Sequence, residues 1–137
     1  MHMTLLKPKE LNEGFIRNLA DKGPVVMVNL VRLRTRATDD SGAGWDAYVR
    51  YSEITMPLIK SCGGMVLWAG KAEGMAFGKA NGRCWDYVVL VRYPSRKAFL
   101  DMVTSSDYAT ANVHRENAVE DHIILSCAES YSKFPLR

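Results

Sequence analysis

The chain has 137 residues, which predicts one domain with a sizeable core and leaves no room for two ordinary domains. Hydrophobic residues make up 47% and charged residues 24%, the balance of a soluble globular protein rather than of a disordered chain. The net charge of +3 is too small to predict nucleic-acid binding, and no apolar run approaches the ~20 residues of a membrane span.

The first half of the chain predicts two helices around one strand. Residues 7–21 predict a helix, in which three apolar residues recur at helical spacing: Leu11, Phe15 and Leu19. A near-continuous apolar strand is predicted over 25–34, a pattern typical of a strand that is covered on both faces. After a polar loop over 35–44, residues 45–64 predict a second helix that is bent or restarted at Pro57.

The second half predicts three strands and two helices. A short strand is predicted over 65–70, and glycines punctuate its connection to a strongly apolar strand over 85–93. Two helices and a last strand follow, over 95–105, 105–121 and 122–130. The predicted N-caps of these two helices are Ser95 and Ser106.

From Val25 onward the predicted order is strand, helix, strand, strand, helix, strand. This is the split arrangement of an α+β ferredoxin-like domain with an antiparallel sheet, whose helices cover one face. The first strand carries large apolar residues on both sides: Met27, Val31 and Leu33 on one, and Val26, Val28 and Leu30 on the other. An uncovered apolar face of this size is unusual in a monomer, so we expect a homodimer with the sheets packed face to face.

Four stretches of the sequence carry a resemblance to a known family: "VVMVNLVRLR" (25–34), "AYVRYSEITMPLIKSCGGMVLWAG" (47–70), "WDYVVLVRYPSRKAFLDMVTSSDY" (85–108) and "HRENAVEDHIIL" (114–125). The most specific part is "YPSRKAF", a tyrosine followed by an arginine on the next helix. On these residues the chain resembles the domain-of-unknown-function family 1330 (DUF1330), in the dimeric α/β-barrel superfamily of ferredoxin-like proteins.

The resemblance implies a dimer whose two sheets form a barrel-like core, with a cavity of small-molecule size beside each sheet. It implies no particular reaction, because one fold serves many chemistries. The chain would then be a single dimeric α/β-barrel domain over 1–137, with the family core at 24–130 and a helical N-terminal extension at 1–22.

Polar residues on the predicted strands are the first candidates for a binding site. Asn29 interrupts an apolar face, and a buried amide needs a hydrogen-bond partner, either from the backbone at a bulge or from something in a cavity. Asp86 and Arg92 share one face of the strand over 85–93, where each needs a partner or a wet cavity unless it lies at a solvated strand end. We predict that Asn29 and Arg92 bind a ligand and that Asp86 is a candidate for proton transfer.

The helix over 105–121 supplies three further candidates. Tyr108 and Arg115 fall on the stripe that faces the sheet, and both match the DUF1330 pattern. We predict that Arg115 anchors an anion or a carbonyl group, the alternative being that it reaches out to solvent. His114 is the candidate general base, because an unperturbed imidazole titrates near neutrality, the alternative being a surface histidine. His122 begins the last strand and is expected to be structural.

Aromatic residues complete the predicted pocket. Tyr48 and Tyr51 match paired tyrosines of the DUF1330 family, and buried phenols usually need a hydrogen-bond partner. We predict that Tyr48 contacts the ligand, although aromatic residues at helical spacing are more often core. Trp68 lies just before Gly70, where a ring can line a cavity.

Cysteine and histidine usage predicts neither a disulfide nor a metal site. The three cysteines are an odd and scattered set, which is most simply three reduced thiols in a cytoplasmic protein: Cys62, Cys84 and Cys127. The N-terminus also lacks the apolar core of a secretory signal. No ligand-type residues have zinc-site spacing and no glycine-rich loop has a phosphate-binding context, so we expect no metal and no cofactor.

Two functional hypotheses of different classes follow. The leading one is a homodimer that binds a small anionic or aromatic molecule, extending to an enzyme that acts without metal on a small organic acid or aromatic compound. The alternative is a non-catalytic binding or interaction module, in which the dimer surface is the functional part. Nucleic-acid binding is a minor third hypothesis, which rests on three alternating arginines, Arg32, Arg34 and Arg36. We expect neither a nucleic-acid nor a membrane partner.

Overall fold

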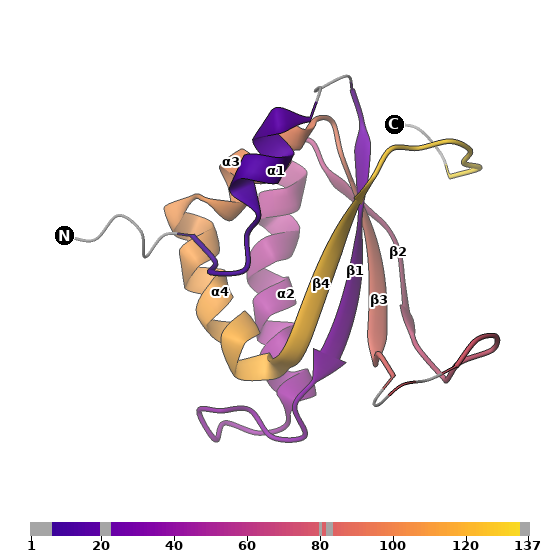
Figure 1. Ribbon diagram of the computed structural model, residues 1–137. Coiled ribbons are helices and arrows are strands. Elements are labelled where there is room, and N and C mark those ends of the chain that lie inside the picture. The colour runs from indigo at the N-terminus through magenta and orange to yellow at the C-terminus, as the bar shows by residue number, and fades with distance from the viewer. Residues whose placement is uncertain (1–6, 20–22, 80, 82–83, 135–137) are drawn as a thin grey trace.

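The structure is a computed structural model that describes residues 7–19, 23–79, 81 and 84–134. Its elements follow the order α1 (Glu13–Asn18), β1 (Val25–Leu33), α2 (Gly44–Ser61), β2 (Met65–Lys71), β3 (Tyr87–Tyr93), α3 (Arg96–Val103), α4 (Ser106–Ala118) and β4 (Val119–Cys127). The strands form one antiparallel sheet in the order β2-β3-β1-β4, and α2, α3 and α4 lie on one face of it (Figure 1). The predicted α+β ferredoxin-like topology is therefore confirmed.

The central strand β1 sets the two faces of the sheet. Val25, Met27 and Val31 point toward the helices and are fully buried, in keeping with the alternation of side chains along a strand. Asn29 belongs to this same face, opposite Val89 of β3 and Ile124 of β4. The sequence of β1 thus places one amide in an otherwise apolar layer between sheet and helices.

Within the described residues, no helix lies on the other face of the sheet, which we call the open face. Figure 1 shows described parts of the β2–β3 connection and of the C-terminal tail projecting on that side. Large apolar side chains stay exposed there, among them Trp68 at 50% and Leu125 at 49%. They flank a row of half-buried residues on the central strands: Val26, Val28, Leu30, Val88 and Leu90. A surface of this kind is typical of a face that another protein covers.

The long helix α2 runs through Pro57 without a restart, so of the two predicted alternatives, a bend or a restart, the restart is wrong. Pro57 is exposed, and because it has no N–H it donates no backbone hydrogen bond within the helix. The helix ends in a Schellman motif, in which Gly64 N–H donates to Ile59 C=O at 2.8 Å and Gly63 N–H donates to Lys60 C=O at 3.0 Å. Gly63 has a φ of 86°, which explains the glycine at that position.

Serine side chains begin both shorter helices on the sheet. Ser95 Oγ accepts from Ala98 N–H at 3.0 Å at the start of α3, as predicted. Ser105 Oγ accepts from Tyr108 N–H at 3.1 Å at the start of α4, so the cap lies one residue before the predicted Ser106. The C-terminal end of α4 also differs from the prediction, since β4 begins at Val119 and His122 therefore lies inside the strand.

The N-terminal helix is much shorter than the predicted span of 7–21. It covers six residues, and Ile16 is the buried one, whereas Phe15 is 61% exposed. Helices of this length depend on tertiary packing, and Gly14 lowers the helical propensity further. Residues 7–12 instead lead into α1 as an irregular segment, while residues 1–6 and 20–22 of the predicted extension lie outside the described part of the chain. Within the described residues, no helix has the length and apolar character needed to cross a membrane.

Candidate functional site

A continuous hydrogen-bonded row, which we call the polar row, consists of four side chains from separate parts of the fold: Glu10, Arg115, His122 and Asn29. Arg115 of α4 donates from Nε to His122 Nδ1 of β4 at 2.8 Å. His122 Nε2 lies 2.9 Å from Asn29 Oδ1 of β1. At the other end, Arg115 Nη2 donates to Glu10 Oε2 at 3.3 Å, and Nη1 donates to Asn112 Oδ1 at 2.9 Å. The row joins the N-terminal segment to the centre of the sheet.

The donor from Arg115 determines the tautomer of His122. Since an arginine N–H can only donate, Nδ1 must accept, and the remaining ring proton sits on Nε2 and is donated to Asn29 Oδ1. Burial, and after it the positive charge of Arg115, lowers the pKa of His122 to about 3. The imidazole is therefore neutral at physiological pH.

Asn29 satisfies the requirement that the sequence indicated for a buried amide. Its Nδ2 donates to Met27 C=O and to Val89 C=O, both at 3.3 Å, while its oxygen accepts from His122. The two alternatives for this residue, a backbone partner or a partner at a cavity, are thus both present. Because the amide has partners on both sides, its orientation follows from that of the imidazole.

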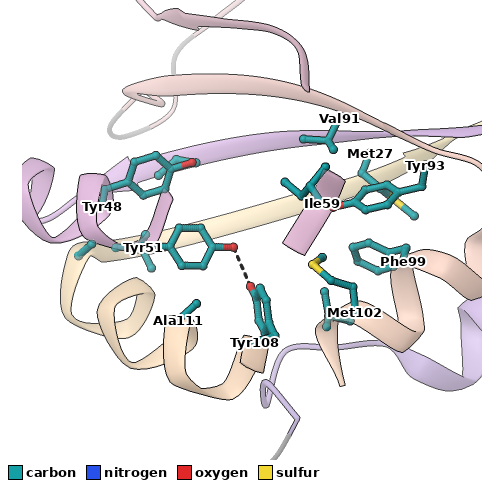
Figure 2. Close-up of a cluster of buried hydrophobic side chains, with 14 of the residues drawn as sticks. Met27, Tyr48, Tyr51, Ile59, Val91, Tyr93, Phe99, Met102, Tyr108 and Ala111 are labelled. Carbon is teal, nitrogen blue, oxygen red and sulfur yellow. Dashed lines mark hydrogen bonds between the residues drawn. The ribbon is translucent and has the colours of Figure 1, made fainter. Parts of the chain in front are cut away.

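A pair of tyrosines lies beside the polar row. The hydroxyl groups of Tyr51 on α2 and Tyr108 on α4 are 2.7 Å apart, and the rings meet edge to face with centroids at 6.0 Å (Figure 2). Both side chains are buried, and burial is the main reason that the pKa of each phenol is raised. One phenol donates to the other, so one O–H proton of the pair has no partner among the described residues.

Two adjacent cavities border the polar row and the tyrosine pair. The first, of about 430 Å³, lies between the N-terminal segment, α3, α4 and β4, and its wall includes Glu10, Arg115 and His122. The second, of about 280 Å³, lies between α2 and the sheet, and its wall includes Asn29, Tyr48 and Tyr51. The residues common to both walls are Met27, Phe99, Val103, Tyr108 and Ile124. Both cavities are mostly apolar with a few polar groups, which is typical of small-molecule sites.

The structure brings together four of the predicted ligand-binding residues. Asn29 and Arg115 belong to the polar row, and Tyr108 and Tyr48 line the cavities beside it. Tyr48 is buried, and burial raises its pKa well above the usual range of a tyrosine. The stretch after "YPSR" and the paired tyrosines therefore do lead to one place in the fold.

Two other predicted ligand-binding residues lie on the open face instead. Arg92 follows the buried Val91 on β3 and so points away from the helices, with its Nε 3.8 Å from Glu129 Oε1. Trp68 of β2 is 50% exposed, and its ring covers Gly70, leaving no room for a Cβ there. Arg92 thus does not converge with Asn29 and Arg115.

The two candidates for proton transfer also lie apart from the cavities. Asp86 precedes β3 and accepts from Leu33 N–H at 2.7 Å, which ties the end of β1 to the start of β3. His114 is half-buried on α4, and its Nδ1 has no hydrogen-bond partner among the described residues. Neither residue lines either of the two cavities.

The three arginines behind the nucleic-acid reading lie at the end of β1 and in the residues that follow it. Arg32 on β1 stacks over the Trp85 ring at 4.4 Å, and Arg36 in the following loop pairs with Asp40 at 2.6 Å. Arg34 lies between them, after the end of β1. Among the described residues, no group of three or more His, Cys, Asp or Glu side chains is arranged to hold a metal ion.

Sequence reasoning missed Glu10 and the role of His122. The signal for His122 was present, because alternation along "VEDHIILSC" places His122 with Ile124 on the face that also carries Asn29. Starting the last strand at residue 122 hid this pattern. Glu10 carries no local signal, since its partner Arg115 is 105 residues away in the chain.

These features define the class of the protein, which is a ferredoxin-like α+β domain with a polar row at the wall of a cavity of small-molecule size. The chain belongs to the DUF1330 family, described as "Domain of unknown function (DUF1330)", which it matches over residues 43–127. A comparison with functionally curated proteins gives no match.

Solved structures with the same fold come from several bacteria. A protein of unknown function from Rhodopseudomonas palustris is 35% identical, with a TM-score of 0.77 over 96% of this chain and 97% of that one. A dimeric ferredoxin-like protein of unknown function from Thermobifida fusca is 15% identical, with a TM-score of 0.52 over 82% and 97%. A dimeric protein of unknown function from Bacteroides fragilis is 14% identical, with a TM-score of 0.50 over 79% and 98%.

Proposed function

We propose that the protein is a homodimer that binds a small organic molecule, anionic or aromatic, in the cavity beside Arg115. The observation that carries this proposal is a guanidinium that is 4% exposed and yet lies at the wall of a cavity of about 430 Å³. A buried charge is costly unless it is paired, and ionisable groups in such surroundings cluster at functional sites.

Arg115 keeps donors for a ligand. Its hydrogen bonds to His122, Asn112 and Glu10 use three of the five N–H groups of a guanidinium. Within the part of the chain that the structure describes, the other two N–H groups have no protein acceptor. A carboxylate or a carbonyl oxygen at the cavity wall would satisfy them in the planar geometry that arginine favours.

Tyr108 supplies a second polar group at the same wall. It lines the first cavity and shares a hydrogen bond with Tyr51, and the pair retains one unused O–H proton. A phenol and a guanidinium together can hold one oxygen-bearing end of a ligand. The apolar side chains of the cavity, such as Phe99 and Val103, would cover the rest of it.

The geometry favours binding over acid–base catalysis through a histidine. His122 uses its Nδ1 lone pair to accept from Arg115, and its pKa of about 3 keeps it from taking up a proton near neutrality. His114 lines neither cavity. The function that we propose is therefore recognition of the ligand, with no step assigned to an imidazole base.

The open face supports the proposed homodimer. Its apolar side chains, Trp68 and Leu125 among them, are half exposed in the single chain. Face-to-face packing of two such sheets would bury them. The solved relatives from Thermobifida fusca and Bacteroides fragilis, which share the fold, are both described as dimeric.

A thermal-shift screen tests the binding site. The purified protein is heated with small carboxylates, lactones and phenols, and a ligand that binds only the folded state raises the melting temperature as its concentration increases. The wild type is compared with Arg115→Met, which keeps the aliphatic stem and removes the guanidinium. The matched control is Arg50→Met, because Arg50 lines neither cavity. We expect a shift in the wild type and in the control that is lost in Arg115→Met.

A second variant covers the case in which Arg115→Met does not fold. Leu11→Trp fills the first cavity from the N-terminal segment and leaves the four partners of the polar row in place. Loss of the shift in Leu11→Trp supports the site independently. A shift that survives both variants, or no shift with any compound, would refute the pocket and favour the alternative of an interaction module.

A further inference from the structure

The N-terminal segment places a carboxylate of the chain itself on the anchor of the pocket. Glu10 Oε2 lies 3.3 Å from Arg115 Nη2, and the two side chains differ sharply in burial, with 57% of Glu10 exposed against 5% of Arg115. The contact therefore joins a fixed interior cation to a carboxylate that reaches in from the surface. The same segment forms one wall of the first cavity, through Pro8, Leu11 and Asn12.

Charge balance makes the position of Glu10 informative. Arg115 contacts a neutral imidazole at Nε and a neutral amide at Nη1, and the nearby tyrosines are protonated. Among the described residues, Glu10 is the carboxylate that forms an ion pair with this guanidinium. With Glu10 in place the site is electrically neutral, so a second carboxylate would have to share the charge of Arg115 with Glu10 unless it displaced it.

Two features favour the exchange of Glu10 for another carboxylate on Arg115. Residues 7–12 have no regular secondary structure, and the backbone bond that orders them is Leu11 N–H to Pro8 C=O at 3.2 Å. The ion pair is exposed on its Glu10 side, where water competes with Arg115 for the carboxylate and weakens the contact. A ligand that brings its own carboxylate together with an apolar body would gain burial that Glu10 cannot.

We propose that Glu10 occupies the place of a ligand carboxylate, and that the ligand is a monocarboxylate with an apolar body whose carboxylate displaces Glu10 from Arg115. This inference rests on the proposed function and specifies its ligand class. The apolar body would lie among side chains of the first cavity that surround the anchor: Leu11, Phe15, Ile16, Phe99 and Val103. A dicarboxylate is disfavoured, because its second charge would lie in this apolar wall without a partner.

The test measures affinity by isothermal titration calorimetry, with octanoate and phenylacetate as probes and phenylacetamide as the uncharged match. The key variant is Glu10→Gln, which removes the competing charge and keeps the shape of the side chain. Its matched control is Glu13→Gln, because Glu13, the first residue of α1, pairs with Lys7 and Arg17 and does not contact Arg115. Circular dichroism establishes that each variant is folded.

We expect Glu10→Gln to bind the monocarboxylates on the order of five-fold more tightly than the wild type, the factor that corresponds to loss of an exposed competing ion pair. Phenylacetamide should bind both proteins equally, and Glu13→Gln should match the wild type. Equal or weaker binding of the acids by Glu10→Gln would overturn the inference and leave the proposed function standing, provided that Arg115→Met loses the wild-type affinity. No binding to any of these proteins, or binding unaffected by Arg115→Met, would overturn both.

Discussion

His122 accepts a hydrogen bond from Arg115, with 2.8 Å between Nδ1 and Nε, although both side chains are basic. The contact is favourable because the imidazole is neutral, and it holds that imidazole neutral because a proton on Nδ1 would face the guanidinium. A protonated His122 would repel Arg115, so the two residues are compatible while the imidazole is neutral. The stability of the fold should depend on that charge state.

The first prediction concerns acid stability. The unfolded chain takes up a proton on His122 near pH 6.5, whereas the folded chain does so only near its pKa of about 3. Between these values the unfolded state binds more protons, so the free energy of unfolding should fall by up to about 1.4 kcal/mol for each unit by which the pH is lowered. Urea unfolding at pH 7.0, 6.0 and 5.0 measures this slope.

A glutamine variant separates His122 from the other titrating groups. His122→Gln can still accept from Arg115 and should show a flatter profile than the wild type between pH 6.5 and 5. Equal slopes for the wild type and His122→Gln would contradict the assignment of a buried neutral imidazole.

The second prediction concerns the tyrosine pair. Tyr51→Phe and Tyr108→Phe each leave one buried hydroxyl without its 2.7 Å partner, so each should cost about 1–3 kcal/mol of unfolding free energy. The double variant removes both hydroxyls and should be less destabilised than the sum of the two, by about 1 kcal/mol. Strict additivity in this double-mutant cycle would mean that the two hydroxyls do not interact.

The third prediction concerns the start of α2. A Cβ on Gly44 would lie 2.8 Å from the carbonyl oxygen of Ala118 and closer still to that of Arg34. Because both contacts are to backbone, Gly44→Ala should lower the free energy of unfolding by about 1–3 kcal/mol, seen as a lower urea midpoint. Gly14→Ala is the control, since a Cβ there meets nothing within 4 Å. A wild-type midpoint for Gly44→Ala would show that the start of α2 can move away from the Arg34 and Ala118 backbone at little cost.

The fourth prediction concerns the open face. Val28 lies at its centre, between Leu90 of β3 and Leu125 of β4, so Val28→Glu should convert a dimer into a monomer. The control is Val113→Glu, at a valine of α4 that is 57% exposed. Sedimentation velocity at micromolar concentration measures both variants. A monomeric wild type, or a Val28→Glu variant that stays dimeric, would argue against packing through this face.

Most of the fold could be predicted from local patterns. The strands 25–33, 65–71 and 87–93 follow from apolar runs between turn residues, and the start of α3 follows from Ser95. The predicted helix over 7–21 was too long, because three apolar residues at helical spacing carry no information on how far tertiary contacts stabilise a helix there. The start of β4 was misjudged because a helix leads directly into it at Val119, with no glycine or proline between them.

The candidate site was predictable only in part. Asn29 and Arg115 stand out because polar side chains on apolar faces need partners, and the structure supplies those partners. Alternation along β4 indicates which face His122 occupies, but that His122 joins the two also depends on the order of the strands, since the three residues lie on three elements. Arg92 shows the opposite case, in which a charged residue on a central strand faces the other side of the sheet.

The polar row also limits which sequences can be reached from this one by single substitutions. A chain with apolar side chains at Asn29, Arg115 and His122 would bury no unpaired group there, and such replacements can be neutral or stabilising. Each single step toward it, however, leaves a buried donor or acceptor without its partner. The row can therefore be lost only through several coordinated changes, so it acts as a barrier between this sequence and otherwise viable neighbours.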